Sequence, residues 1–128
     1  MNPPAFLASS LAVALGGGFG AWLRFALGRL IPAAQFPFAT LTVNIVGSFA
    51  IGLLAGWLAR HGTGGEGWRL LLGVGVLGGF TTFSAFSLEL VLMIERGTPG
   101  VAVLYAAVSV IAGIAGLFGG LLLMRAVG

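Results

Sequence analysis

Long stretches without a charged residue alternate with short polar segments along the whole chain. Four such stretches occur, and each approaches the roughly 20 residues that span a bilayer as an α-helix. They run from Phe6 to Leu23, from Phe38 to Ala59, from Leu70 to Leu88 and from Val101 to Met124. The pattern predicts an all-α membrane protein with four transmembrane helices in a single domain, residues 1–128. The helices are expected over roughly residues 5–30, 38–60, 68–95 and 100–126.

Composition supports this prediction and excludes most other classes. Hydrophobic residues make up 59% of the chain and charged residues 7%, whereas about 25% of the residues of an average soluble protein are charged. With no cysteine, one histidine and three acidic residues, the chain lacks the side chains of a disulfide framework or of a zinc or di-iron site. The sequence therefore does not predict an enzyme.

The six arginines do not favour one orientation in the membrane. Four spans divide them equally between the two sides, with Arg60, Arg69 and Arg125 on one side and Arg24, Arg29 and Arg96 on the other. Because the Lys/Arg bias of short loops sets orientation, an even distribution predicts dual topology, with copies inserted in both directions. The alternative is that six charges are too few to count and that Arg24 lies inside the membrane.

Glycine is abundant inside the predicted helices, with 23 residues in the chain of 128. Several glycines form pairs at i and i+4, namely Gly16 and Gly20, Gly52 and Gly56, and Gly116 and Gly120. Such pairs let helix backbones approach closely in lipid. Helices packed this tightly would fill their own centre, so a pathway through the protein requires a second copy, and we expect a homo-oligomer.

Polar side chains inside the apolar stretches are informative because an unsatisfied polar group in hydrocarbon is costly. Asn44 lies in the middle of the second stretch, with Thr40 and Ser48 one turn away on the same helix face. An amide has two donors, so Asn44 can either bridge two helices or contact an anion. The sequence leaves both alternatives open.

The third stretch contains the densest group of polar residues, in the run Gly78-Gly79-Phe80-Thr81-Thr82. Two glycines followed by two threonines favour an interrupted helix with free carbonyl groups. Broken helices in membranes usually line a cavity or an ion site. The alternative is a mild kink in which the threonine hydroxyls restore the hydrogen bonds.

Phenylalanines recur every three residues here, at Phe80, Phe83 and Phe86, with Ser84 and Ser87 on a neighbouring stripe. Such a stripe commonly faces lipid or packs against another helix. It could also contact an anion, because the edge of a phenyl ring is electropositive and attracts an anion without trapping it.

The sequence does not decide between a structural and a functional role for two further sets of polar residues. In the fourth stretch, Tyr105 and Ser109 share one face and could form a short hydroxyl track or only packing hydrogen bonds. Arg24 and Glu89 lie at the same side of the membrane in the predicted topology. They could pair, shape the field at a vestibule, or only anchor their helices at the interface.

Taken together, these motifs resemble the Fluc (CrcB) family of fluoride channels. The resemblance covers nearly the whole chain and includes the runs Gly18 to Phe25, Thr40 to Phe49 and Gly78 to Glu89. The Gly-Gly-Phe-Thr-Thr-Phe-Ser-x-Phe-Ser pattern in the last run is highly specific. The resemblance implies an antiparallel dual-topology homodimer with two fluoride pores at the subunit interface, in agreement with the even division of the arginines.

The resemblance also implies roles for single residues. Phe83 and Phe86 are similar to the phenylalanines whose ring edges contact fluoride, and Asn44 to the amide donor that lines the pore. Further pore residues are hydroxyl-bearing: Thr82, Ser84, Ser87, Tyr105 and Ser109. Gly113 stands where another hydroxyl would extend the track on the fourth helix.

A structural sodium ion at the dimer centre is implied as well, held by the backbone carbonyl groups of Gly78 and Thr81. Unwound carbonyl groups suit a hard cation, and its buried charge would help to balance anions that pass nearby. Arg24 is similar to an arginine at the vestibule of the family, and Glu89 lies near the same entrance.

The function implied is passive, fluoride-selective conduction that exports cytoplasmic fluoride through the bacterial inner membrane and confers fluoride resistance. One alternative is a small proton-coupled multidrug exporter, which needs an acidic residue in its first helix; the stretch from Phe6 to Leu23 contains none. A second alternative is a non-conducting membrane scaffold whose glycines serve only assembly.

Overall fold

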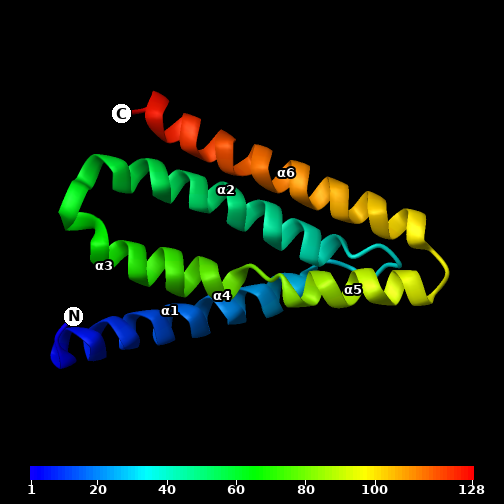
Figure 1. Ribbon diagram of the computed structural model, residues 1–128, viewed down its shortest axis with the longest axis horizontal. Helices are drawn as coiled ribbons and strands as arrows, with labels where there is room; N and C mark the ends of the chain where they lie inside the picture. The colour runs from blue at the N-terminus through cyan, green and yellow to red at the C-terminus, as the bar shows by residue number, and fades with distance from the viewer.

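The structure is a computed structural model that describes residues 1–128, and it consists of helices and connecting turns with no strand (Figure 1). The elements are α1 (Pro3–Leu30), α2 (Phe38–His61), η1 (Gly62–Gly65), α3 (Glu66–Trp68), η2 (Arg69–Leu77), α4 (Gly78–Phe80), α5 (Ser84–Glu95) and α6 (Pro99–Ala126). Three helical stretches are long and apolar enough to cross a membrane: Pro3–Leu30, Phe38–Glu95 and Pro99–Ala126. The predicted all-α membrane class is confirmed.

The stretch Phe38–Glu95 reverses its direction at η1, so the segment from α3 to α5 runs back along α2 (Figure 1). The reversal begins at Gly62, whose φ of 52° is in the left-handed region that favours glycine. Directly after the turn, the guanidinium of Arg69 donates to the carboxylate of Glu66 at 2.9 Å. A glycine-rich turn and an exposed ion pair therefore mark this end of the molecule.

The segment that follows the turn is not a regular α-helix. Residues Arg69–Leu77 form a π-helix, in which each backbone N–H bonds to a carbonyl one residue further back than in an α-helix. The sequence predicts one helix over residues 68–95 and does not foresee this change of helix type. Because π-helical turns are rare and occur at functional sites, their position directly before the interruption of the helix is notable.

Glycines allow the closest helix contacts in the molecule. Gly16 on α1 is buried against η2, and a Cβ atom there would lie 2.6 Å from the carbonyl oxygen of Leu71. Gly52 on α2 is buried against α6, and a Cβ atom there would overlap the carbonyl group of Leu117. The other buried glycines of these helices are Gly20, Gly47, Gly56 and Gly120. The small-residue pairs predicted on α1 and α2 are thus confirmed as contacts within one chain.

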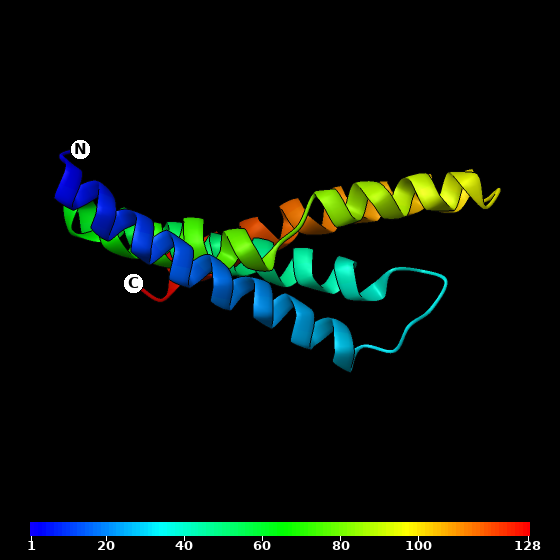
Figure 2. The same cartoon turned by 90° about the horizontal axis from the view of Figure 1, so that it is seen from below.

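Most large apolar side chains lie on the surface, as a lipid environment permits. Only 13 of the 128 residues are buried, and the largest fully buried side chains are Tyr105, Met93 and Val43. Tyr105, Met93 and Ala102 form a small core where α5 meets α6. Seen from below, α5 and this part of α6 diverge from the end of α1 and the beginning of α2 (Figure 2).

Substitution of Gly52 by alanine tests the contact between α2 and α6. The added Cβ meets backbone, so Gly52→Ala should destabilise the fold by about 1–3 kcal/mol. Gly119→Ala is the matched control, because nothing lies within 4 Å of a Cβ at that position and alanine is the better helix former. The measurement is the thermal unfolding midpoint of each purified variant in detergent. Equal midpoints for the two variants would contradict the close approach.

Candidate functional site

The site is organised by an interruption of the helix between α4 and α5. α4 ends at Phe80 and α5 begins at Ser84. Thr81 has extended backbone, with φ of −81° and ψ of 159°. Its backbone N–H donates to the carbonyl group of Leu77 at 3.0 Å, and its hydroxyl donates to the same carbonyl at 2.9 Å. The predicted interruption is confirmed, and it lies just beyond the two adjacent glycines.

Asn44 on α2 holds the interrupted backbone in place. Its side-chain nitrogen donates to the carbonyl oxygen of Thr82 at 2.9 Å, and its side-chain oxygen accepts from the backbone N–H of Thr82 at 2.8 Å. The amide thus replaces both backbone partners that Thr82 would have in a continuous helix. Asn44 therefore bridges α2 and the interrupted segment, as one of the two alternatives predicts. The second N–H of the amide makes no hydrogen bond within the protein and remains available to a ligand.

A cavity of about 340 Å³ lies beside Asn44 and the interrupted backbone. It is an open cavity between α2, the segment around the interruption and α6, and it combines apolar walls with a few polar groups. Its lining residues are Asn44, Gly47, Ser48, Ile51, Thr81, Thr82, Phe83, Phe86, Ser109, Val110 and Leu117. Asn44, Ser109 and the two phenylalanines, which the sequence identifies separately, are therefore brought together in one place.

Phe83 and Phe86 flank this cavity with their ring centroids 5.9 Å apart and their planes at 47°. Phe83 follows the interruption directly and is 79% exposed in the single chain. Phe86 is partly buried, and its ring meets the ring of Tyr105 edge to face at 5.0 Å. One ring is thus fixed by packing, while the other projects from the surface of the chain.

The hydroxyl groups near the interruption mostly serve the local backbone. Thr82 accepts from the backbone N–H of Ala85 at 3.2 Å and so caps the start of α5. Ser84 lies 3.4 Å from the hydroxyl of Thr82, and Ser87 donates to the carbonyl group of Phe83 at 2.9 Å. Neither Ser84 nor Ser87 lines the cavity. Of these three residues, only Thr82 is at the cavity wall.

The end of α4 has carbonyl groups that no backbone N–H satisfies. The N–H of Thr82 bonds to Asn44 instead of to Gly78, and no other backbone N–H bonds to the carbonyl of Gly78 or Thr81. The Gly79 carbonyl accepts from Nε of Arg24 at 3.3 Å. Free carbonyl oxygens at an interrupted helix suit a hard cation, so the carbonyl groups of Gly78, in α4, and of Thr81, in extended backbone, fit the sodium ion that the family resemblance implies.

Arg24 and Glu89 do not pair, which corrects one of the alternatives drawn from the sequence. The only ion pair in the structure joins Arg69 and Glu66. Arg24 donates to the end of α4, where a cation is favourable at a helix C-terminus. Each of the two charges thus has its own partner in a different part of the molecule.

Glu89 is held by two hydroxyl groups. The hydroxyl of Thr40 donates to Oε1 at 2.5 Å, and the hydroxyl of Tyr105 donates to Oε2 at 2.6 Å. Charge-assisted hydrogen bonds of this length are among the stronger ones in proteins. Glu89 therefore links α2, α5 and α6. The sequence identifies all three residues but does not predict that they meet.

Tyr105 and Ser109 lie on one face of α6 but have different surroundings in the structure. Tyr105 is fully buried and its hydroxyl is used by Glu89, so it does not line the cavity. Ser109 lines the cavity, and its buried hydroxyl oxygen has no hydrogen-bond partner. A buried hydroxyl without a partner is uncommon in native proteins, which indicates that the Ser109 hydroxyl forms its hydrogen bond with a ligand.

Apolar helices, a helix broken beside a polar cavity and unsatisfied polar groups at that break define a multi-pass membrane protein of the channel and transporter class. The family model described as CrcB-like protein, Camphor Resistance (CrcB), matches residues 11–121. The chain therefore belongs to the CrcB family, and the resemblance stated from the sequence is confirmed.

Relatives of known name agree with this assignment. The chain is 63% identical over 120 residues to the fluoride-specific ion channel FluC of Novosphingobium aromaticivorans, with 90% of this chain and 94% of the relative covered. It is 54% identical over 123 residues to the FluC of Phenylobacterium zucineum, with 91% and 95% covered. The FluC of Caulobacter vibrioides is 51% identical over 121 residues, with 91% and 95% covered.

Removal of the Asn44 amide tests its role at the interruption. Asn44→Leu would leave the backbone N–H and C=O of Thr82 without partners, so we expect a loss of about 1–3 kcal/mol in unfolding free energy. Ser48→Ala, one turn further along α2, removes a hydroxyl that makes no side-chain hydrogen bond and should leave stability unchanged. Unfolding in detergent, followed by circular dichroism, compares the two. A wild-type midpoint for Asn44→Leu would show that other groups hold the interruption.

A double-mutant cycle tests the link through Glu89. Tyr105→Phe and Thr40→Val each remove one hydroxyl from the same carboxylate, so their effects on unfolding free energy should deviate from additivity by about 0.5–2 kcal/mol. Ser87→Ala replaces Thr40→Val in the control cycle, because the Ser87 hydroxyl bonds to Phe83 and not to Glu89. Additive effects in both cycles would contradict a shared carboxylate.

Proposed function

We propose that the protein is a fluoride-selective channel that lets fluoride leave the cytoplasm passively, down its electrochemical gradient. The carrying observation is the cavity in which an Asn44 N–H, the unpartnered Ser109 hydroxyl and the exposed ring of Phe83 converge. The fluoride-specific ion channels named among its relatives support the choice of ion. The function is transport and not catalysis, and the site of action is the bacterial inner membrane.

Selection of fluoride follows from the donors available in the cavity. Fluoride is small and strongly hydrated, so a pore must replace its water with hydrogen-bond donors fixed at short distance. Asn44 is fixed by its two hydrogen bonds to Thr82, and its remaining N–H and the Ser109 hydroxyl supply such donors. The edges of Phe83 and Phe86 add weak positive potential without a full charge that would trap the ion.

The working form that we propose is an antiparallel homodimer with dual topology. Phe83 is 79% exposed beside an open polar cavity, and a second copy would cover both. In this arrangement the stretch Phe38–Glu95 crosses the bilayer twice, which gives four transmembrane helices per chain. The even division of the six arginines between the two sides favours insertion in both directions. Symmetry then generates two equivalent pores.

A sodium ion at the centre of this dimer would satisfy the carbonyl groups of Gly78 and Thr81. Gly78 lies in α4 and Thr81 in extended backbone, and neither carbonyl oxygen accepts a backbone hydrogen bond, so both are suitable ligands for a hard cation. The charge would also favour anions nearby. In this proposal the sodium ion stabilises the dimer, whereas the side chains of the cavity select fluoride.

The remaining polar residues have supporting roles in the proposed channel. Arg24 contributes positive potential near the end of α4, and Glu89 shapes the field at the entrance on the side of Thr40. Tyr105 acts through Glu89, because its hydroxyl is fully used there. The hydroxyls of Thr82, Ser84 and Ser87 stabilise the start of α5 and so fix the position of Phe83.

Fluoride efflux from liposomes tests the function. Vesicles that contain the protein should release fluoride rapidly and retain chloride, as read with two ion-selective electrodes. Phe83→Ile should reduce fluoride release about five- to tenfold, since loss of the ring-edge interaction removes an energy on the order of 1–1.5 kcal/mol. Phe6→Ile is the matched control, because Phe6 is 65% exposed, lies near the beginning of α1 and does not line the cavity. Wild-type release by Phe83→Ile, or no release by folded dimer, would overturn the proposal and favour the scaffold alternative.

A further inference from the structure

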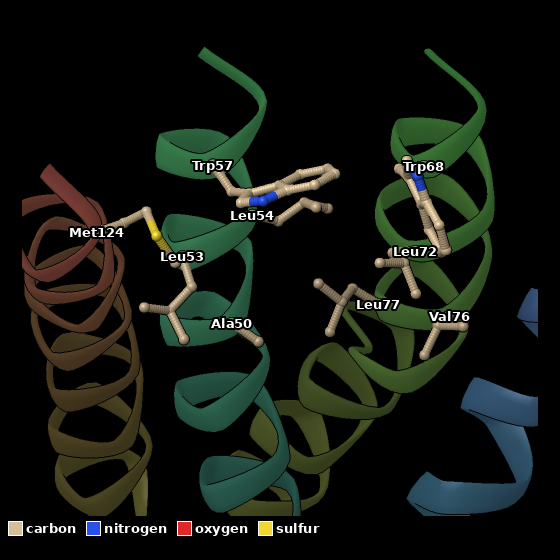
Figure 3. A pocket seen from close by; sticks show the side chains of 9 residues that line it. All are labelled: Ala50, Leu53, Leu54, Trp57, Trp68, Leu72, Val76, Leu77 and Met124. Atoms are coloured by element: carbon tan, nitrogen blue, oxygen red, sulfur yellow. The ribbon is translucent and has the colours of Figure 1, made fainter. Parts of the chain in front are cut away.

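An apolar groove between α2 and η2 offers an anion no route to the polar cavity. The groove has a volume of about 440 Å³, and only hydrophobic residues line it, among them Leu53, Leu72 and Trp68 (Figure 3). It shares no residue with the polar cavity around Asn44. Because a second copy covers the open side of the polar cavity in the proposed dimer, fluoride needs another entrance from the water.

Two further cavities lie at the end of the molecule where α1 connects to α2 (Figure 2). The first, here called the outer cavity, has a volume of about 380 Å³ and lies between the connector, residues 31–37, and the pair Thr40 and Glu89. The second, the inner cavity, has a volume of about 310 Å³ and lies between α1, α2 and the start of α5.

The outer cavity, the inner cavity and the polar cavity adjoin one another. Four residues line both the outer and the inner cavity: Gly28, Arg29, Ala39 and Thr40. Thr82 lines both the inner cavity and the polar cavity. The three cavities therefore follow one another from the end of α1 to the site at Asn44.

Three charged groups line the outer and inner cavities. Arg29 is exposed in the last turn of α1, lines both cavities and forms no ion pair. Arg24 lines the inner cavity, and its Nε donates to the backbone of α4. Glu89 lines the outer cavity, and its carboxylate accepts hydrogen bonds from two hydroxyl groups. Without Arg29, the outer cavity would carry only the negative charge of Glu89.

We propose that these two cavities form an entrance for fluoride and that Arg29 attracts the anion to it. A cleft with walls of low dielectric constant focuses the field of a charge and raises the local concentration of ions of opposite sign. The guanidinium of Arg29 offsets the carboxylate of Glu89, so an anion can pass from the water toward Arg24. The inference rests on the proposed fluoride conduction, but the potential in the cavities can be measured without it.

Thiol modification measures this potential. The chain has no cysteine, so Ala39→Cys introduces a single thiol at the wall that the two cavities share. The probes are the anionic sulfonatoethyl methanethiosulfonate and the cationic trimethylammonioethyl methanethiosulfonate. In this background, Arg29→Gln should lower the ratio of the anionic to the cationic reaction rate about three- to tenfold, because one positive charge is removed from a cleft. Arg29→Lys keeps the charge and should preserve the ratio.

Arg125→Gln is the matched control. Arg125 also lies in the last turn of a long helix, α6, but it lines neither cavity, so its removal should leave the ratio unchanged. Fluoride efflux from liposomes should be about threefold slower for Arg29→Gln than for Arg125→Gln at low ionic strength. A salt with an impermeant anion should reduce this difference, because added ions screen an exposed charge.

The outcomes separate this inference from the proposed channel function. A rate ratio that does not respond to Arg29→Gln, or that responds equally to Arg125→Gln, would overturn the role of Arg29. If neither reagent modified the Ala39→Cys thiol, the cavities would be closed to water, and the proposed entrance would be wrong. If the ratio changed as expected but the wild type released no fluoride, the channel function would be wrong and the charge of the cavities would stand.

Discussion

The structure depends on one requirement, that every backbone polar group inside a membrane finds its partner within the protein. The interruption between α4 and α5 violates the regular helical pattern, and two side chains compensate for it. Asn44 bonds to both backbone groups of Thr82, and Arg24 donates to the carbonyl group of Gly79. The polar cavity exists because these contacts hold unwound backbone open beside α2.

Close helix packing makes this arrangement rigid. Gly47 on α2 is buried directly against Thr81, so the interrupted backbone approaches α2 closely enough for Asn44 to reach Thr82. Gly16 and Gly75 play the corresponding part between α1 and η2. Because the buried core of the protein is small, backbone contacts at glycine set the positions of the hydrogen-bond donors in the cavity. Discrimination between ions of similar charge requires donors at such fixed positions.

The sequence predicts the fold class, the helical stretches and most members of the site, because long apolar runs and isolated polar residues are strong signals in a membrane protein. It predicts that Asn44 matters but not that its partner is the backbone of Thr82. It places Tyr105 and Ser109 on one face, although only Ser109 reaches the cavity. Partners such as Thr40 for Glu89 depend on how helices distant in sequence approach each other, which periodicity within one helix does not contain.

The π-helical segment Arg69–Leu77 determines how the chain tolerates a change in its length. A π-helical turn holds an additional residue compared with an α-helical turn, so this segment stores length that a regular helix would not accommodate. Loss of a single residue here would convert a π-helical turn to an α-helical one and leave the residues on either side in the same phase. The same loss in a regular α-helix such as α5 would rotate everything that follows by about 100°. The orientation of Phe83 and of the carbonyl groups beside it is therefore less sensitive to a one-residue deletion in this segment than to one in the neighbouring α-helices.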